Sequence, residues 1–204
     1  MIVIIDYGMG NLRSVQKAFE RIKTAATISN DRSVIEGAHK LVLPGVGHFA
    51  NGMEKLQTLG LLDVLNYKAL DQRIPILGIC LGMQLFTRFS EEGDAAGLGW
   101  IPATTKRFNF NGASVKLKVP HIGWNSMRVQ KPCALLKNSE ANDMFYFVHS
   151  YFVDCKHRDD VLCKSVYGIE FDSVVHHENI LGMQFHPEKS YRSGLNLIRN
   201  FVDI

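Results

Sequence analysis

The chain has 204 residues, of which 46% are hydrophobic and 21% are charged, and its formal net charge is +3. This length and composition predict one globular domain spanning residues 1–204, and they exclude a disordered chain, a collagen and a small disulfide scaffold. No apolar run reaches the ~20 residues of a membrane span, and the N-terminal run lacks the basic flank of a signal peptide. No block of basic residues favours nucleic acid or a membrane surface as a partner. We therefore expect a cytoplasmic protein.

The first half of the chain alternates between two patterns. Short apolar runs predict strands, and apolar residues at helical spacing predict helices. The predicted strands are Ile2–Ile5, Ala25–Ser29, Lys40–Leu43 and Ile74–Ile79, and the predicted helices are Leu12–Ile22 and Leu61–Leu70. Strands separated by helices imply βαβ units and a parallel sheet that is buried on both faces.

The second half of the chain is richer in strand patterns. Strands are predicted at Val115–Val119, Met144–Val148, Val161–Tyr167, Phe171–Val175 and Ile180–Phe185, and a closing helix at Leu195–Val202. The sequence therefore predicts an α/β fold in which a mostly parallel central sheet is flanked by helices and extended by added antiparallel strands.

Cys80 stands at a predicted corner between a strand and a helix, in the segment Gly78-Ile-Cys-Leu-Gly82. This spacing is the thiol version of the G-x-S-x-G elbow, in which neighbours without Cβ atoms permit a sharp turn. The N-terminus of a helix favours a thiolate, and its N–H groups can stabilise an oxyanion. Cys80 is therefore a candidate nucleophile. The alternative is a buried structural cysteine at a strand end.

A thiol nucleophile for acyl transfer needs a base, and the base needs a group that orients it. His186 follows the apolar run Ile180–Phe185 and begins the segment His186-Pro-Glu188. Proline favours an extended conformation of the residue before it, so His186 and Glu188 are expected to face the same side of the chain. Cys80 and His186 lie at the ends of predicted core strands, where open α/β sheets bind their ligands.

Two kinds of ligand site are not supported by the sequence. Gly8-x-Gly10 follows the first predicted strand, but position 13 is Arg13, so the third glycine of a dinucleotide-binding loop is missing. No group of His, Cys and Asp residues has the spacing of a metal site. We expect no cofactor and no metal.

The segments Gly78–Gln84 and Gln184–Ser190 together resemble the triad-type, class I glutamine amidotransferases. Further segments resemble the glutaminase subunits of imidazole glycerol phosphate synthases, and they extend the resemblance over essentially the whole chain. They are Asp6–Asn11, Pro44–Gly47, His121–Asn125 and Phe145–Tyr151.

The resemblance implies roles for individual residues. Cys80 would attack the side-chain amide of glutamine, His186 would relay protons, and Glu188 would orient His186. An oxyanion would be stabilised by the N–H group of Leu81 together with that of Val46 or Gly47. The positions that match the glutamine-binding residues of the family are Gln84, Ser150 and Tyr151.

The resemblance also implies a heterodimer. In this family the released ammonia enters a cyclase subunit, a (β/α)8 barrel, which closes an imidazole ring on a ribonucleotide in histidine biosynthesis. The positions that match residues facing this partner are Asn11, Tyr146 and Lys189. Glutamine turnover is expected to be weak until the partner binds its nucleotide, and Gly45 and Gly47 would permit a peptide flip in the oxyanion segment.

Two other functions stay open at this point. Gly97–Ile101 and Tyr167–Phe171 also resemble related glutaminase subunits that supply ammonia to an ATP-dependent sugar amidotransferase in surface-polysaccharide biosynthesis. Their catalytic residues would be identical. The second alternative is an unrelated cysteine hydrolase or an inactive scaffold subunit. The intact set of Cys80, His186 and Glu188 argues against an inactive form, and the His-Pro-Glu segment on a late strand argues against unrelated hydrolases.

Overall fold

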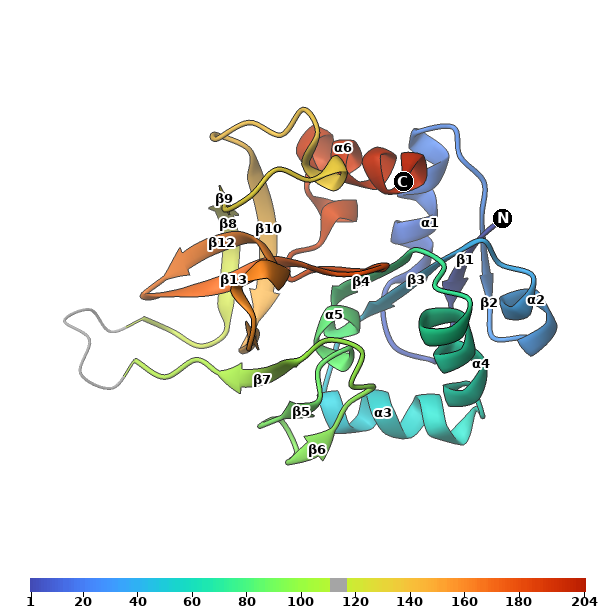
Figure 1. Cartoon of the computed structure of the whole chain (residues 1–204). Coiled ribbons are helices and arrows are strands. Elements are labelled where there is room, and N and C mark those ends of the chain that lie inside the picture. Colours follow the sequence, from blue (N-terminus) through green and yellow to red (C-terminus); the bar gives the residue numbers. More distant parts are fainter. Residues whose placement is uncertain (111–116) are drawn as a thin grey trace.

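Five parallel strands lie at the centre of the protein (Figure 1). The computed structural model describes residues 1–110 and 117–204. In spatial order the five strands are β2 (Ala26–Ser29), β1 (Ile2–Ile5), β3 (Lys40–Gly45), β4 (Ile76–Cys80) and β14 (Ile180–Met183). Every residue of β1, β4 and β14 is buried, which explains their unbroken apolar runs, because helices cover both faces of the sheet.

Helices cover the two faces of the parallel strands (Figure 1). One face carries α1 (Leu12–Arg21) and α6 (Tyr191–Asp203). The other carries α2 (Arg32–Glu36), α3 (Phe49–Thr58), α4 (Leu62–Asn66) and the π-helical turn η1 (Tyr67–Asp71). Side chains alternate between the faces, so Ile4 packs in one core with Phe19, and Ile5 packs in the other with Phe49. None of the helices in the described part of the chain has the length and apolarity to cross a membrane.

Antiparallel strands extend the sheet beyond β14. They continue through β13 (Ile169–His177), β11 (Tyr151–Cys155), β7 (Ala103–Arg107), β5 (Phe89–Ser90) and β6 (Ala95–Ala96), and β12 (Val161–Tyr167) and β9 (Arg128–Val129) branch from β13. Among the described strands of this extension, only β5 and β7 pair in parallel. A separate two-stranded sheet consists of β8 (His121–Ser126) and β10 (Met144–His149). The predicted α/β fold, with a mostly parallel centre and added antiparallel strands, is confirmed.

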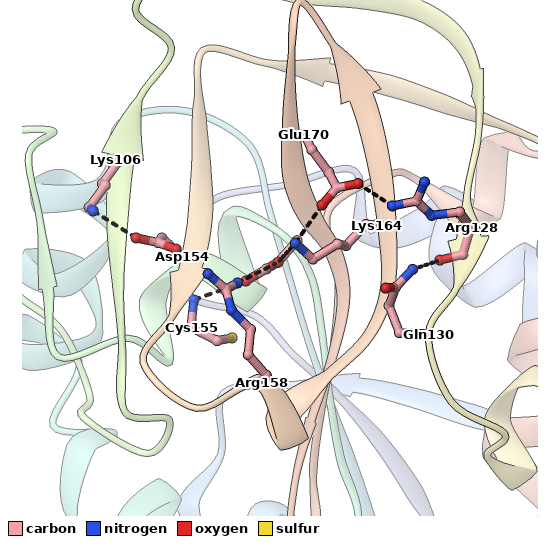
Figure 2. A network of polar contacts seen from close by, with 9 residues as sticks. Lys106, Arg128, Gln130, Asp154, Cys155, Arg158, Lys164 and Glu170 are labelled. Atoms are coloured by element: carbon pink, nitrogen blue, oxygen red, sulfur yellow. Dashed lines mark hydrogen bonds and ion pairs between the residues drawn. The ribbon is translucent and has the colours of Figure 1, made fainter.

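Polar side chains link the antiparallel strands on their outer surface, as Figure 2 shows. Lys106 of β7 pairs with Asp154 of β11 at 2.6 Å, and Glu170 of β13 pairs with both Lys164 and Arg128. Exposed ion pairs of this kind contribute ~0–1 kcal/mol each. Burial of the apolar faces, rather than these pairs, therefore accounts for the stability of this region.

The structure differs from the sequence prediction in several elements. The predicted helix Leu61–Leu70 is α4 followed by the π-helical turn η1. The helix α3 was not predicted because Gly52 interrupts its helical pattern; in the structure Gly52 lets α3 approach Leu85, since a Cβ there would lie 3.2 Å from the Leu85 side chain. Of the predicted strand Val115–Val119, residues 115 and 116 lie outside the described residues, and residues 117–119 form no strand.

Candidate active site

Cys80 is the last residue of β4 and directly precedes the short helix α5 (Leu81–Leu85). Its backbone has φ +53° and ψ −109°. A residue with a side chain reaches this region only at a cost of about 1–3 kcal/mol, and such strain persists where the surrounding structure demands it. The strained corner turns the Cys80 side chain out of the strand at the carboxyl edge of the parallel sheet, where a ligand can reach it.

The two glycines that flank Cys80 are required by close packing. A Cβ atom on Gly78 would lie 2.4 Å from the Phe86 ring and 2.6 Å from the backbone nitrogen of Met83. A Cβ on Gly82 would lie 1.7 Å from the carbonyl oxygen of Leu43. The elbow predicted from the glycine spacing is therefore present, and it depends on contact between α5 and the neighbouring strand β3.

His186 and Glu188 form a buried pair. Nδ1 of His186 lies 2.9 Å from Oε1 of Glu188, and the two side chains are 3% and 2% exposed. His186 is extended, as predicted from Pro187, but the chain then turns into the 3-10 helix η4 (Pro187–Lys189). The predicted pairing is therefore formed across a tight turn rather than along an extended strand.

Cys80 and Glu188 together favour a protonated His186. Burial opposes the positive charge of the imidazolium, but the electrostatic interactions with Cys80, and then with Glu188, outweigh it and raise the pKa of His186 to about 10. Because Nδ1 faces Glu188, the other ring nitrogen, Nε2, is the one available for proton exchange with Cys80 and a substrate. The arrangement matches a nucleophile, a base and a group that orients the base.

The Cys80 sulfur has two further polar neighbours that sequence analysis did not identify. Nε2 of Gln184 lies 3.8 Å from Sγ, and Sγ lies 3.9 Å from the carbonyl oxygen of Val148. The side chain of Gln184 is oriented by Gln84, whose Nε2 donates to Oε1 of Gln184 at 3.2 Å. Gln184 stands two residues before His186, so the same period-two reasoning could have placed it on the side of the site.

A cavity of about 420 Å³ opens at Cys80, a size within the ~300–1,000 Å³ of small-ligand pockets. A larger hollow of about 650 Å³ beside α6 contains none of the residues predicted from sequence, so we assign the site to the smaller cavity. The residues that line it are Val46, Gly47, Cys80, Leu81, Gln84, Glu92, Pro120, Val148, His149, Ser150, Tyr151 and Lys189.

All residues predicted to bind an oxyanion or glutamine line this cavity. The structure adds Glu92, which sequence analysis missed because nothing in its loop marks it. Oε2 of Glu92 accepts a hydrogen bond of 2.8 Å from the backbone nitrogen of Phe49 at the start of α3. This contact holds a carboxylate at the cavity, at a place that suits a cationic group of a ligand.

The Pro44–Gly47 segment reaches the cavity because Gly45 is paired with Cys80 across β3 and β4. Gly45 is closely surrounded, since a Cβ there would lie 2.2 Å from the hydroxyl of Tyr7. Gly47 has φ +114°, a conformation that favours glycine. The backbone of the segment therefore passes close to Cys80, and the crowding at Gly45 and Gly47 leaves space there for glycine and for close approach of the backbone to a ligand.

The residues predicted to face a partner lie outside the buried His186–Glu188 pair. Asn11 is exposed and accepts a hydrogen bond of 3.2 Å from the Ser14 backbone as the N-cap of α1. Lys189 is exposed at the edge of the cavity, and its Nζ lies 5.7 Å from the centre of the Tyr146 ring. Lys189 and Tyr146 thus share one surface.

The other cysteines differ from Cys80 in their surroundings. Burial and the neighbouring Cys133 raise the pKa of Cys163 to about 12, and burial and nearby carboxylates raise that of Cys155 even further. Both stay as unreactive thiols at neutral pH. Within residues 1–110 and 117–204, no group of three or more His, Cys, Asp or Glu side chains is arranged to hold a metal ion.

The chain is similar to known proteins over its whole length. The family model "Glutamine amidotransferase class-I" matches residues 3–204. A protein of Methanococcus maripaludis named imidazole glycerol phosphate synthase subunit HisH 2 is 48% identical over 99% of this chain and 98% of its own length. One of Leptospira borgpetersenii, named imidazole glycerol phosphate synthase subunit HisH, is 44% identical over 100% of both chains.

A solved structure shares the fold. The crystal structure of a glutamine amidotransferase superposes with a TM-score of 0.76 at 18% identity, and the match covers 100% of this chain and 98% of that one. The full-length family match and the identity to the curated relatives lead to one conclusion. This chain belongs to the class-I glutamine amidotransferase family.

Proposed function

We propose that this chain is the glutaminase subunit of an imidazole glycerol phosphate synthase and that it hydrolyses glutamine through Cys80, His186 and Glu188. The observation that carries the proposal is the buried His186–Glu188 pair, joined electrostatically to a cysteine that opens on a ligand-sized cavity. The names of the full-length relatives support the reaction and the pathway.

The chemistry proceeds in two half-reactions. The Cys80 thiolate attacks the side-chain amide carbon of glutamine, and the imidazolium of His186 gives its proton to the leaving nitrogen, so that ammonia departs and a thioester remains. His186 then takes a proton from water, the resulting hydroxide attacks the thioester, and glutamate leaves as the Cys80 thiolate returns. Glutamine and water thus give glutamate and ammonia, with no cofactor required.

Backbone N–H groups would stabilise the oxyanion in both half-reactions. The N–H of Leu81 stands at the start of α5, directly after the nucleophile, and Val46 and Gly47 line the same cavity. Preorganised donors of this kind are aimed at the charge that develops on the carbonyl oxygen in the transition state. We assign the oxyanion hole to Leu81 together with Val46 or Gly47.

Glutamine would bind along the wall formed by Gln84, Ser150 and Tyr151. The carboxylate of Glu92 is available at the cavity for the α-ammonium group of the substrate. Charge-assisted hydrogen bonds are stronger than neutral ones, so Glu92 would contribute to selection of an amino acid over a simple amide.

A partner would bind the surface that carries Tyr146 and Lys189. Trp124 and Tyr191 lie beside them with stacked rings 5.3 Å apart, yet they are 44% and 74% exposed. Exposed aromatic side chains of this kind are enriched at protein interfaces. We infer that these four residues, here called the aromatic patch, and Asn11 face a cyclase (β/α)8 barrel in a cytoplasmic heterodimer that receives the ammonia.

The proposal is tested by measuring glutamate release from glutamine, first with this protein alone and then with the cyclase from the same genome and its ribonucleotide substrate. Strong stimulation by the complex is expected. Reaction of Cys80 with a glutamine analogue, but no stimulation by the cyclase, would contradict the assigned partner and favour the sugar-amidotransferase alternative. Absence of both would contradict the glutaminase itself.

Glu188→Gln is expected to lower the stimulated kcat about 10- to 100-fold, because the amide oxygen still accepts from His186 but the charge that favours the imidazolium is lost. The effect is smaller than that of removing His186. Steady-state glutaminase assays of the complex measure it, with Glu178→Gln as the control on an exposed carboxylate. Unchanged activity of Glu188→Gln would remove Glu188 from the catalytic set.

Lys189→Ala is expected to lower the stimulation by the cyclase more than the glutaminase activity of the isolated chain. The reason is that Lys189 lies on the aromatic patch, the surface proposed to contact the cyclase. The ratio of stimulated to unstimulated kcat measures this effect. Lys55→Ala, on the exposed surface of α3, is the matched control. An unchanged ratio in Lys189→Ala would contradict an interface at Lys189.

A further inference from the structure

Two buried histidines other than His186 face each other across β8 and β10. His121 and His149 are register partners of the two strands, and they are 3% and 5% exposed. Nδ1 of His121 lies 3.0 Å from Nε2 of His149. The ring of His121 is stacked between Tyr167, at 4.1 Å between centroids, and Phe147, at 4.9 Å. Both imidazoles are thus held in one orientation.

The hydrogen-bond partners assign the protons of both rings. Nδ1 of His149 lies 2.8 Å from the carbonyl oxygen of Tyr151, which can only accept, so Nδ1 carries the proton and Nε2 accepts. Nδ1 of His121 therefore donates to His149, and its Nε2 accepts from Nδ2 of Asn125 at 3.5 Å. The second amide hydrogen of Asn125 bonds to the Val166 carbonyl at 2.9 Å. The chain of donors runs in one direction, from Asn125 to Tyr151.

This direction requires both histidines to be neutral. Burial lowers the pKa of His121 to about 4. Burial, together with the neighbouring His121 and His186, lowers the pKa of His149 to about 3 against the opposing effect of the hydrogen bond to Tyr151. Both imidazoles are therefore neutral at physiological pH, as the donor assignment demands.

The chain of hydrogen bonds ends in the wall of the glutamine cavity. The Tyr151 carbonyl accepts a second hydrogen bond of 2.9 Å from Nε2 of Gln84, so its two acceptor positions are both occupied. Val148, His149, Ser150 and Tyr151 line the cavity in one continuous segment. Strand pairing fixes the course of this segment, and the side chains of His149 and Gln84 hold the Tyr151 carbonyl from two sides.

We propose that Asn125, His121 and His149 are positioning residues for glutamine hydrolysis, and that their hydrogen bonds hold the 148–151 segment in the orientation that binds glutamine. This inference rests on the proposed binding of glutamine along Ser150 and Tyr151. We call the chain of hydrogen bonds from Asn125 through His121 and His149 to Tyr151 the relay. It begins on β8, which also carries Trp124 of the aromatic patch. The substrate wall is thus connected by hydrogen bonds to the strand that a partner would contact.

The test compares two substitutions of His149 in the complex with the cyclase and its ribonucleotide. His149→Phe removes the donor to Tyr151 and is expected to raise KM for glutamine about 5- to 10-fold, with a smaller change in kcat. In His149→Asn the amide nitrogen takes the place of Nδ1 and donates to Tyr151, but the acceptor for His121 is lost, so KM is expected to lie between the native value and that of His149→Phe. Phe110→Leu alters the same aromatic cluster without removing a hydrogen bond, and its KM is expected to stay unchanged.

Equal KM values for His149→Phe and His149→Asn would overturn the proposal, because loss of packing rather than of the donor would then explain the change. If His149→Phe does not fold, His121→Phe and His121→Asn give the same comparison one step earlier in the relay, since asparagine keeps the donor to His149. Cys80→Ala is assayed in parallel. Retained activity in Cys80→Ala would refute the proposed function, whereas an inactive Cys80→Ala with equal KM values in the histidine pair would refute the relay alone.

Discussion

Cys80→Ala is expected to lower glutamate release by the complex at least about 10⁴-fold, because the thiolate forms the covalent intermediate and no other group can take its place. The loss should appear in kcat. His186 would remain paired with Glu188 through the 2.9 Å hydrogen bond, so the variant is expected to stay folded. Glutamate release under stimulated conditions is the measurement.

Two controls separate the nucleophile from the rest of the enzyme. With ammonium salt in place of glutamine, the cyclase in the Cys80→Ala complex should work normally, because it no longer depends on the thiol. Cys133→Ala, a partly buried thiol outside the cavity lining, should leave glutamate release intact. Full glutaminase activity of Cys80→Ala would show that Cys80 is not the nucleophile.

Gly82→Ala is expected to destabilise the protein by about 3 kcal/mol and to inactivate it, although it adds a single methyl group. That methyl carbon would lie 1.7 Å from the carbonyl oxygen of Leu43, and neither atom is at the end of a flexible side chain. Either α5 or β3 must move. Leu43 immediately precedes Pro44–Gly47, so the shift displaces the proposed oxyanion segment as well.

Urea unfolding and glutamate release measure the two effects of Gly82→Ala. Gly37→Ala is the matched control, because Gly37 has φ −77° and its added Cβ would meet its nearest neighbour at an ordinary 3.6 Å. Its effect is expected to stay within about 0.5 kcal/mol. Native stability and activity in Gly82→Ala would show that the contact between α5 and β3 does not constrain the elbow.

The arrangement of the fold could be predicted where burial leaves a clear pattern. Strand β4 was evident because helices cover both of its faces and every residue in it is apolar or glycine. The strand β8 was not predicted, since its burial alternates and Gly123 and Asn125 weaken the strand pattern. The two-residue strand β9 depends on pairing with the distant β12, for which a local pattern contains no signal.

The proposed catalytic residues could be selected from local chemistry. The glycines around Cys80 predicted the elbow because a sharp corner excludes Cβ atoms, and the proline after His186 predicted its extended backbone. Together with the motifs of the family, these local constraints identified Cys80, His186 and Glu188 from sequence alone.

Only the tertiary structure brings these segments together. Pairing of Met183 with Ile79 places Gln184 and His186 beside Cys80, although they are far apart in the chain. Glu92 and the relay from Asn125 to Tyr151 have no local signature, because a loop carboxylate or a buried histidine looks ordinary until its partners are known. The sequence alone determined which residues have the chemistry and the backbone to react. The pairing of β4 with β14 and of β8 with β10 decided which groups meet, because contacts between distant segments depend on the whole core.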